Sequence, residues 1–549
     1  MKTVLSVLLC LIITITTKSQ TTLQHSKEIA AFCKIWGFLK YYHPLVSKGS
    51  QNWDKEFTTR ISQISSLHSR KEISEYYSSW ISSLGEVATC KKCNNDVPDS
   101  LKYNLNLSWL SDSSMFDAKL IAQLKFIREN RNQSENYYVR QTGIGNTTYK
   151  NEKPYKDSIY PSIQLRLLGL SRYWNIINYF YPYKYAIGED WNNALTEMIP
   201  VFYNSKDTLE YHLAMLQLTA KLNDSHAGFV TYFTNSYFGL KWAPFTFRLI
   251  DNKAIVTGFY NDSLCKLNNI KIGYIFLTVN NLPIAEIIKE KSKYIGASND
   301  AARLSTMYYA IFNGNSDSVN VTFERDGKVT KKNLRRYYLT DFLFEGLDAK
   351  KSTSSMLDSN IGYINMGKLQ PKDVTGTINK FKKAKAIIFD ARNYPNWTIY
   401  QIANLLNSSK QPFAKFTTPN MSYPGVFNKY IPAITCGENN LNYYKGKVVL
   451  LFNERTQSQA EFTMMALQTA PNVISIGSNT VGADGDISII TFPGGYQTWM
   501  TGLGVYYPDG RETQRIGLIP NIKVVPSIEG IKQGRDEVLE KAIEIINSK

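Results

Sequence analysis

The chain has 549 residues, of which 43% are hydrophobic, 20% charged and 13% aromatic. These proportions exclude a fibrous protein, a mainly disordered one and a polytopic membrane protein, and at about 150 residues per domain the length suggests three or four domains. The formal net charge is +17, but the lysines and arginines are scattered in pairs and triplets and form no nucleic-acid-binding motif, so we expect no nucleic-acid partner.

The first twenty residues (1–20) are typical of a secretory signal peptide. Lys2 precedes an apolar run over residues 4–15, and polar residues 16–20 follow. The apolar run is too short to span a bilayer comfortably, and Cys10 is preceded by leucines where a lipidated cysteine requires small residues. No later apolar run reaches membrane-spanning length. We therefore expect an exported protein, periplasmic or extracellular, with no integral membrane segment after signal cleavage.

Five cysteines remain after cleavage, and only Cys90 and Cys93 form a C-x-x-C pair. In an exported protein this spacing favours a small disulfide over a redox centre. A zinc site would need further ligands, and the sequence contains neither a second C-x-x-C nor an H-x-x-x-H. We expect no metal and no cofactor, and the odd count leaves at least one thiol free and buried.

The helical pattern of the first two hundred residues contains a repeat. W-G-F-L-K-Y-Y-H-P at 36–44 is followed nine residues later by Trp53, and W-N-I-I-N-Y-F-Y-P at 174–182 is followed nine residues later by Trp191. Because proline ends a helix and the second tryptophan begins a new helical pattern, each copy predicts a helical hairpin. The helical regions that carry the two copies are expected at 21–160 and 161–238.

The pattern changes after about residue 235. Short alternating runs such as F-T-F-R-L-I and V-N-V-T-F-E predict a small β-rich module over residues 239–345. Over residues 346–549 strands alternate with helices, as in A-I-I-F-D-A-R and K-V-V-L-L-F-N, which predicts an α/β layer.

The five histidines of the chain limit the choice of a general base. His212 lies within an amphipathic helical pattern, where a packed or surface histidine is the ordinary expectation. His226 lies instead in L-N-D-S-H-A-G-F, between the predicted end of that helix and a strand-like G-F-V-T-Y-F. Catalytic groups often occupy such loops, although a lone loop histidine is more often structural.

Ser458 lies where the apolar run K-V-V-L-L-F gives way to a helix. The free N–H groups at the start of a helix stabilise an oxyanion in acyl transfer, so a serine in this position is a candidate nucleophile. The alternative interpretation is an ordinary N-cap, with Glu461 completing a capping box. The motifs G-x-S-x-G, H-E-x-x-H and G-x-x-x-x-G-K-[ST] do not occur, which counts against an α/β-hydrolase, a zincin and a P-loop enzyme.

Four ordered segments of the C-terminal two hundred residues resemble the serine peptidase family of the C-terminal processing (tail-specific) proteases and the tricorn core. They are D-A-R-N-Y-P-N-W at 390–397, N-E-R-T-Q-S-Q-A-E at 453–461, N-T-V-G-A-D-G at 479–485 and the segment 506–524, which ends in G-L-I-P-N-I-K-V. Residues 262–281 resemble the PDZ-like domain of the family. The resemblance implies a multidomain α+β protein with an N-terminal helical region, a PDZ-like β-rich module and a C-terminal α/β peptidase core of the ClpP/crotonase-like type.

The resemblance also implies the catalytic residues. Processing proteases use a lysine about twenty-five residues after the nucleophile as the base, but this chain has Ala483 there, and a methyl group cannot take a proton. The tricorn branch uses a Ser-His pair instead, which matches Ser225 and His226. By resemblance Ser458 is the nucleophile of a serine-type peptidase, His226 is its general base and Ser225 assists.

The acid and the oxyanion hole follow from the other motifs of the family. Glu512 is expected to complete the relay, and Gln514 competes for that position, although an amide would not compensate the charge of an imidazolium. The oxyanion hole is expected to use the backbone N–H of Gln459 and one from the turn near Asn396. In this turn Asn396 and Trp397 stand where the family has paired glycines, which let the backbone approach a ligand closely.

Two main classes of function fit these residues. The first is an exported serine endopeptidase that cleaves peptides or unfolded proteins through an acyl-enzyme at Ser458, with the PDZ-like module holding the substrate by strand addition. The second is a catalytically impaired peptide- or ligand-binding protein on the same scaffold, which the lost glycines favour. The retained Ser225, His226 and Ser458 favour the enzyme. A third, weaker option is electrostatic attachment to the cell envelope, and the sequence leaves the oligomeric state open.

Overall fold

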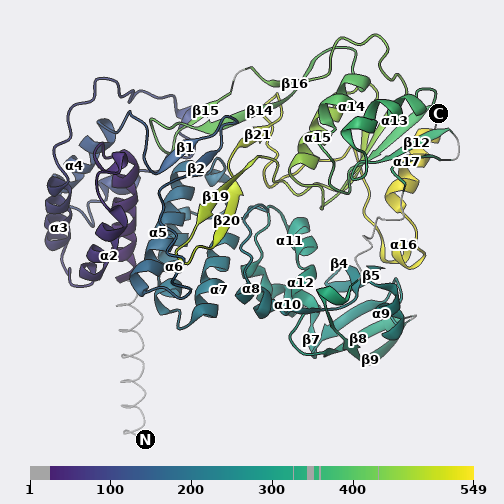
Figure 1. Ribbon diagram of the computed structural model, residues 1–549, viewed down its shortest axis with the longest axis horizontal. Coiled ribbons are helices and arrows are strands. Elements are labelled where there is room, and N and C mark those ends of the chain that lie inside the picture. Colours follow the sequence, from purple (N-terminus) through teal and green to yellow (C-terminus); the bar gives the residue numbers. More distant parts are fainter. Residues whose placement is uncertain (1–24, 326, 343–351, 358–359, 431, 549) are drawn as a thin grey trace, which may run out of the picture. The chain divides into compact units, whose positions relative to one another are not determined.

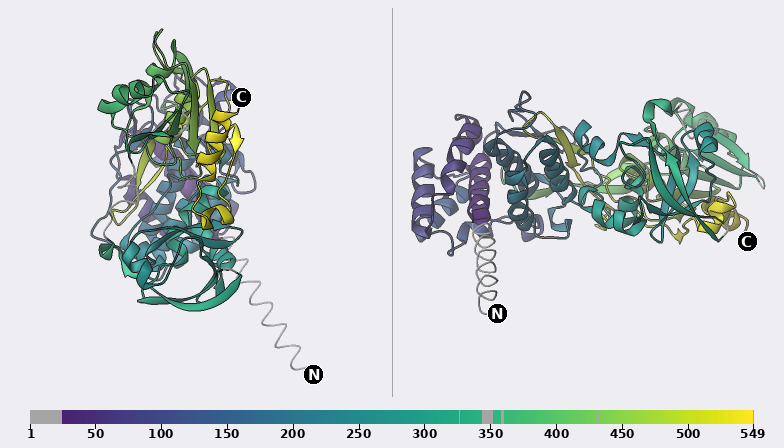
Figure 2. Two further views of the ribbon diagram at one scale, coloured as in Figure 1. Left: turned by 90° about the vertical axis from the view of Figure 1, so that its right-hand side faces the viewer. Right: turned by 90° about the horizontal axis from the view of Figure 1, so that it is seen from below.

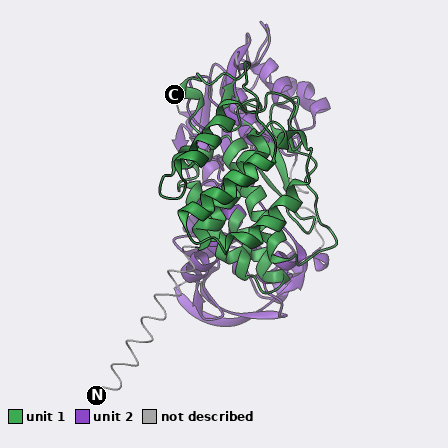
Figure 3. Cartoon of the chain, turned by 90° about the vertical axis from the view of Figure 1, so that its left-hand side faces the viewer, with its two compact units in different colours: residues 1–218, 417–429, 487–503 green, residues 219–416, 430–486, 504–549 purple. Residues whose placement is uncertain are grey.

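The computed structural model describes residues 25–325, 327–342, 352–357, 360–430 and 432–548. The expected signal peptide, with Cys10, lies outside the described residues. The described chain forms two compact units (Figure 3), each assembled from three stretches of sequence. Unit 1 comprises the residues up to 218 with 417–429 and 487–503, and unit 2 comprises 219–416, 430–486 and 504–548. The module boundaries expected at 160, 238 and 345 stay predictions.

Unit 1 is built mainly from helices that begin at side-chain caps (Figure 1). The side chains of Asn52 and Asp190 accept hydrogen bonds from the first-turn N–H groups of the helices that follow them. The helices are residues 25–42, α2 (Trp53–Ile64), α3 (Arg70–Ser83), α4 (Ala118–Glu129), α5 (Ile163–Phe180), α6 (Trp191–Asn204) and α7 (Thr208–Ala220), which runs on into unit 2.

The sequence repeat forms two helical hairpins that are closed in the same way. In the first hairpin the indole N–H of Trp36 donates to the carbonyl of Trp53 at 3.0 Å, and the indole of Trp53 donates back at 3.1 Å. In the second, Trp174 and Trp191 make the same reciprocal pair at 2.8 and 3.1 Å. All four indoles are buried, so each pair satisfies two N–H donors that would otherwise be unpaired away from water. Both predicted hairpins are confirmed.

The first helix and α5 approach each other closely at Gly37. A Cβ at this position would lie 2.0 Å from the side chain of Asn175, so the approach requires glycine. The side-chain amide of Asn175 donates to the carbonyls of Cys33 at 3.0 Å and Ser171 at 2.8 Å. These bonds join the two hairpins and leave the buried amide nitrogen satisfied.

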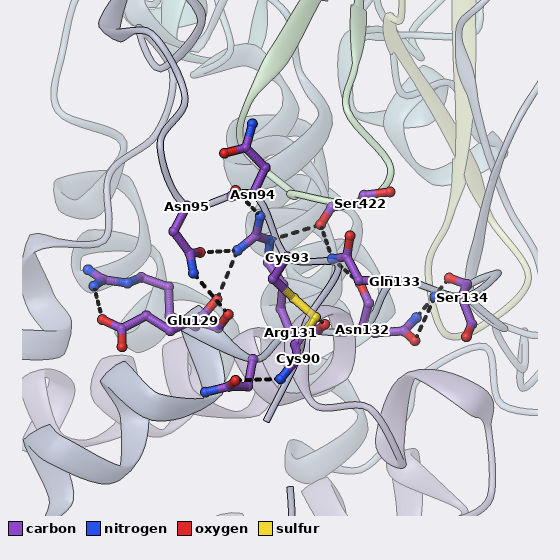
Figure 4. Close-up of a disulfide and its surroundings, with 12 residues drawn as sticks. Cys90, Cys93, Asn94, Asn95, Glu129, Arg131, Asn132, Gln133, Ser134 and Ser422 are labelled. Atoms are coloured by element: carbon purple, nitrogen blue, oxygen red, sulfur yellow. Dashed lines mark hydrogen bonds and ion pairs between the residues drawn. A yellow bond between two sulfur atoms is a disulfide. The ribbon is translucent and has the colours of Figure 1, made fainter. Parts of the chain in front are cut away.

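The C-x-x-C pair is a disulfide in unit 1, as predicted (Figure 4). Beside it, Arg131 donates to the carbonyls of Asn94 at 2.6 Å and Ser422 at 2.9 Å, and its guanidinium lies 3.6 Å from the ring centre of Tyr423. The disulfide loop is thereby linked through one arginine to the segment 417–429. Three further cysteines among the described residues are free and buried, namely Cys33, Cys265 and Cys436.

Two segments from the C-terminal part of the chain belong to unit 1. Residues 487–503 form the antiparallel hairpin of β19 (Ile487–Thr491) and β20 (Gln497–Thr501). Phe492, at the tip of the hairpin, stacks on Tyr173 with ring centres 5.5 Å apart, and Tyr211 donates to the carbonyl of Pro493 at 3.1 Å. The helical unit therefore depends on residues nearly three hundred positions away in sequence.

The middle of the chain forms an antiparallel sheet in unit 2, as the alternating runs predict. The strand order is β4-β5-β6-β8-β9, with the short β7 (Leu282–Pro283) paired to β6. The larger strands are β4 (Phe245–Ile250), β5 (Lys253–Phe259), β6 (Ile275–Val279), β8 (Ser318–Arg325) and β9 (Lys328–Arg335), and the helices are α9 (Asp262–Leu267), α10 (Ile284–Lys291) and α11 (Asp300–Thr306).

The C-terminal part of unit 2 is an α/β layer. Its sheet has the order β11-β12-β13-β17-β18-β22 and is parallel except for the edge strand β11. Apolar residues of α17 cover one face of the sheet (Figures 1 and 2). The strands are β11 (Ser354–Leu357), β12 (Ile361–Asn365), β13 (Ala386–Asp390), β17 (Lys447–Phe452), β18 (Val473–Gly477) and β22 (Ile522–Lys523), and the helices include α13 (Val374–Lys380), α14 (Ile399–Leu406), α15 (Gln459–Leu467) and α17 (Glu537–Asn547).

The parallel sheet fixes where the sequence motifs meet. Strands β13 and β17 are neighbours in register, so their carboxyl ends, Asp390 and Phe452, lie at the same edge. The two motif turns, 391–398 and 453–458, both leave this edge. The hydroxyl of Thr456 donates to the carbonyl of Ala391 at 2.8 Å and joins the two turns directly.

Candidate active site

Ser458 connects strand β17 to helix α15 and has an unusual backbone conformation. Its φ and ψ are +56° and −127°, a region that residues with a Cβ rarely occupy. Its N–H points between two acceptors, the carbonyl of Ala483 at 2.9 Å and the carboxylate of Glu461 at 3.1 Å. Strained residues held by surrounding bonds are concentrated at functional sites, because a structure has to compensate their cost elsewhere.

The N-cap interpretation of Ser458 is also correct, but it is incomplete. Ser458 and Glu461 form a capping box at the start of α15. Two other capping boxes in the chain, at Ser69 and Thr231, have ordinary extended backbones, with φ and ψ of −129° and 152° and of −140° and 168°. Capping alone therefore does not require a positive φ, and the conformation of Ser458 needs another explanation.

Glu461 joins the nucleophile turn, residues 453–458, to the segment 480–483. Its fully buried carboxylate accepts bonds from the N–H groups of Gly482 at 2.8 Å and Ala483 at 3.0 Å, from the hydroxyl of Thr480 and from the N–H of Ser458. Burial raises the pKa of Glu461 to about 7, and these hydrogen bonds oppose the rise. The buried carboxylate of Glu461 thus holds the nucleophile turn in place through these hydrogen bonds.

Ala483 occupies the position that the resemblance assigns to a lysine base. It is fully buried, and its methyl group packs in a small apolar cluster with Ala297, Ala302 and Val481. This packing leaves the position apolar.

The Asp224–His226 loop follows α7 and is anchored by paired bonds. The N–H of Ser225 donates to the hydroxyl of Ser298 at 2.9 Å, and the N–H of Ser298 donates to the hydroxyl of Ser225 at 2.8 Å. One expectation near this loop is wrong: G-F-V-T-Y-F is not a strand. Instead Thr231 caps helix α8 (Tyr232–Phe238), because its hydroxyl and that of Thr234 satisfy each other's N–H groups.

The structure brings this loop to the nucleophile turn. The side-chain amide of Gln457, the residue before Ser458, donates to the carbonyl of Ser225 at 3.3 Å. Ser225 and Gln457 are 232 positions apart in the sequence. The expected nucleophile and the expected base therefore come from two segments that are in direct contact.

Asp224 is a buried carboxylate beside His226 that sequence reasoning did not single out. Its side chain is fully buried, it accepts the backbone N–H of His226 at 3.1 Å, and one of its oxygens lies 3.9 Å from the Nδ1 atom of that histidine. Burial lowers the pKa of His226, and the carboxylates of Asp224 and Asp486 oppose the change. The sequence signal that could have identified Asp224 is its position two residues before His226.

Of the two residues proposed for the end of the relay, the structure places Gln514 next to the histidine loop. Gln514 is buried, and its side-chain amide donates to Asp224 at 3.4 Å. Glu512 is half-buried, and its backbone pairs with Tyr506 in an isolated β-bridge. The side-chain amide of Gln514 therefore contacts Asp224, and Asp224 contacts His226.

The turn near Asn396 keeps a glycine-like backbone without the family glycines. Trp397 has a φ of +43° and a side chain that is 68% exposed, so the indole points to solvent while its backbone adopts the left-handed region. The side chain of Asn396 donates to the carbonyls of Gly367 at 3.0 Å and Leu369 at 3.3 Å. Gln459, the other expected contributor, is the first residue of α15, where a backbone N–H has no partner within the helix.

Two negative findings apply to the described residues. No group of three or more His, Cys, Asp and Glu side chains there is arranged to hold a metal ion. Within the same residues, no helix combines the length and the apolar composition needed to cross a bilayer.

Comparisons with known proteins show what the chain resembles. No curated protein matches the chain. Among solved structures, mature CPAF superposes with a TM-score of 0.57 at 15% identity, over 70% of this chain and 98% of CPAF, and mature CPAF complexed with lactacystin gives 0.56 at 14%, over 70% and 99%. A photosystem II D1 C-terminal processing protease gives 0.37 at 14%, over 68% and 98%, and carries no weight at that score.

At these identities the structures show a shared fold only. The family comparison is independent of them, because it matches residues 360–524 to the model of peptidase family S41. That range contains all of β12, β13, β17 and β18 and both motif turns, the second of which ends at Ser458. Residues 360–524 of this chain therefore resemble the serine-type peptidase domains of family S41.

Proposed function

We propose that the protein is an exported endopeptidase that hydrolyses peptide bonds through an acyl-enzyme at Ser458, with His226 as general base. One observation supports the assignment most directly: the strained serine turn contacts the Ser225–His226 loop through Gln457. A purely structural turn needs neither the positive φ at Ser458 nor a histidine whose side chain is 10% exposed and lies beside its own carboxylate.

In this mechanism His226 takes the proton of the Ser458 hydroxyl while Oγ attacks the scissile carbonyl carbon. The imidazolium then gives this proton to the leaving amine nitrogen, and the C–N bond breaks to leave an ester at Ser458. Water attacks the ester with the same base, which releases the acid and restores both side chains. The N–H of Gln459, with one from the turn near Asn396, stabilises the oxyanion of each tetrahedral intermediate.

Asp224 completes the proposed relay in place of the expected glutamate. Its carboxylate lies close enough to stabilise the imidazolium, and Gln514 holds it there through a hydrogen bond. Ser225 keeps the loop in position through its paired bonds with Ser298. On this proposal Glu512 is not required for catalysis.

The middle module is proposed to act as a PDZ-like domain for the substrate. Its sheet has two outer strands, β4 and β9, to which an extended peptide can add by main-chain hydrogen bonds. Protein or peptide substrates agree with the family of the C-terminal domain. Export to the periplasm or the extracellular space is proposed from the first twenty residues of the sequence and from the disulfide.

The test is labelling of the purified mature protein by a fluorophosphonate probe, with Ser458→Ala and His226→Ala beside it. Labelling of the unmodified protein alone is the expected result, because only a serine with an adjacent base attacks phosphorus at a useful rate. Labelling that persists in Ser458→Ala would assign the nucleophile elsewhere. If none of the proteins is labelled and unfolded proteins go uncut, the binding-protein alternative is correct.

A further inference from the structure

A cavity of about 500 Å³ lies within unit 2, between the middle module and the peptidase layer. One wall is formed by β4 and α11, and the other includes Glu454 and Arg455 of the turn 453–458 and the residues just after Gln514. This volume is typical of pockets that hold small ligands or single side chains of a partner. Arg455, which lines it, is only three residues from Ser458.

The cavity is strongly basic. Among the residues that the structure describes, four cationic side chains line it and one anionic side chain, Glu454. Glu454 is already neutralised, because it forms an ion pair with Arg248 at 2.6 Å and accepts the hydroxyl of Ser478 at 2.9 Å. The positive charges of the other lining residues therefore dominate the cavity, namely Arg455, Arg515 and Lys523.

Arg515 is built into the wall rather than lying loosely on the surface. Its φ of +63° is unusual for a residue with a Cβ, and its N–H donates to the carbonyl of Gly482 at 2.9 Å. Its side-chain Nε–H donates to the carbonyl of Ser298, which is paired with Ser225 of the histidine loop. The cavity wall and the candidate active site are thus joined by these hydrogen bonds of Arg515.

We propose that this cavity binds an Asp or Glu side chain of the peptide substrate. Guanidinium groups bind carboxylates through strong charge-assisted bonds, and apolar side chains of the lining, Phe247, Leu249 and Leu304, can cover the carbons of the same residue. The inference rests on the proposed peptidase function, since it assigns the cavity to the substrate of that site. Binding in this cavity would make the enzyme selective for peptides with a carboxylate at a fixed distance from the scissile bond.

Binding to Ser458→Ala, measured by fluorescence anisotropy, tests the cavity without turnover. Three labelled ten-residue Ala/Ser peptides are compared: one with a central Glu and an amidated end, one with a central Gln and a free end, and one with a central Gln and an amidated end. We expect the first to bind about tenfold to a hundredfold more tightly than the other two. Tighter binding of the second peptide would assign the cavity to the chain end and overturn the inference.

Arg455→Gln and Lys523→Gln, introduced into Ser458→Ala, should each remove most of this preference. Lys328→Gln is the matched control, because Lys328 is an exposed lysine on β9 outside the cavity and should leave the preference intact. Equal or absent binding of all three peptides, or a preference that survives both cavity substitutions, would overturn the inference. Labelling of Ser458 by the fluorophosphonate probe reports separately on the peptidase, so the two proposals fail in different experiments.

Discussion

At the scale of single residues, Asp224 is the proposed acid partner of His226. Replacing it with asparagine keeps the size of the side chain and removes the charge 3.9 Å from the imidazole. We expect Asp224→Asn to lower kcat by about 10²- to 10⁴-fold with little change in KM, as for loss of the acid in other triads. Steady-state kinetics on one peptide substrate measure both constants.

Glu512→Gln provides the matched comparison for this substitution. It makes the same chemical change at the residue that the sequence favoured, on a side chain that the structure leaves half-buried. We expect it to retain nearly full kcat. A large loss in Glu512→Gln together with an active Asp224→Asn would return the relay to Glu512.

The pH profile follows from the pKa of His226. Burial lowers this pKa below its ordinary value of 6.5, and a general base works only when it is neutral. Activity should therefore rise with pH through a midpoint below 6.5 and be level near neutrality. The carboxylate of Asp224 opposes the lowering, so Asp224→Asn should move the midpoint of kcat/KM to still lower pH. A midpoint that stays in place would show that Asp224 has no electrostatic role.

Asp484, next to Ala483, makes stability depend on pH. It is buried, both of its carboxylate oxygens lack a hydrogen-bond partner among the described residues, and burial together with Glu461 raises its pKa well above 3.8. A raised acid pKa means that the folded state binds the proton more tightly, so stability is lost as pH rises. We expect Asp484→Asn to flatten the fall in unfolding free energy as the pH rises above 3.8, measured by denaturant titration. An unchanged slope would contradict this.

At the scale of elements, the reciprocal tryptophan pairs should stabilise the two helical hairpins. Trp174→Phe keeps an aromatic ring but removes the indole donor and leaves a buried carbonyl without that bond. We expect it to lower the unfolding free energy by about 1–3 kcal/mol, seen as a lower denaturant midpoint. Trp109→Phe is the control, since the indole nitrogen of Trp109 has no hydrogen-bond partner within the described part of the chain. Equal losses in the two variants would mean that ring packing alone explains the effect.

The elements also show where sequence reasoning succeeds and where it ends. Strand β17 and helix α15 could be predicted because an apolar run and a capping box are local signals. The positive φ of Ser458 could not, because Ser69 carries the same capping box with an extended backbone. This positive φ accompanies the hydrogen bonds that Glu461 accepts from the N–H groups of Gly482 and Ala483, which depend on tertiary structure. The G-F-V-T-Y-F segment was misjudged because its alternation of apolar residues competes with the cap at Thr231.

At the scale of the whole molecule, the order of the segments along the sequence does not predict the two compact units. Hydrophobic patterns assign 487–503 to the C-terminal region, since nothing local distinguishes this hairpin from the strands around it. Its partners in unit 1 are aromatic side chains of distant helices, such as Tyr173 and Tyr211. Such contacts become visible only once the fold is known, which is why the sequence suggested consecutive modules.

This interleaving predicts that the peptidase part does not fold alone. A chain lacking residues 21–218 would keep 417–429 and 487–503 but lose every unit 1 helix before 219 against which they pack. Phe492, now buried, would then be exposed, and Pro424 would lose the hydrogen bond from Tyr42. We expect this chain to aggregate or to bind a hydrophobic dye, whereas the mature chain from residue 21 does neither. A soluble monomer that gives the near-ultraviolet circular dichroism of packed aromatic side chains and reacts with the fluorophosphonate probe would show instead that unit 2 is autonomous and that unit 1 is an added module.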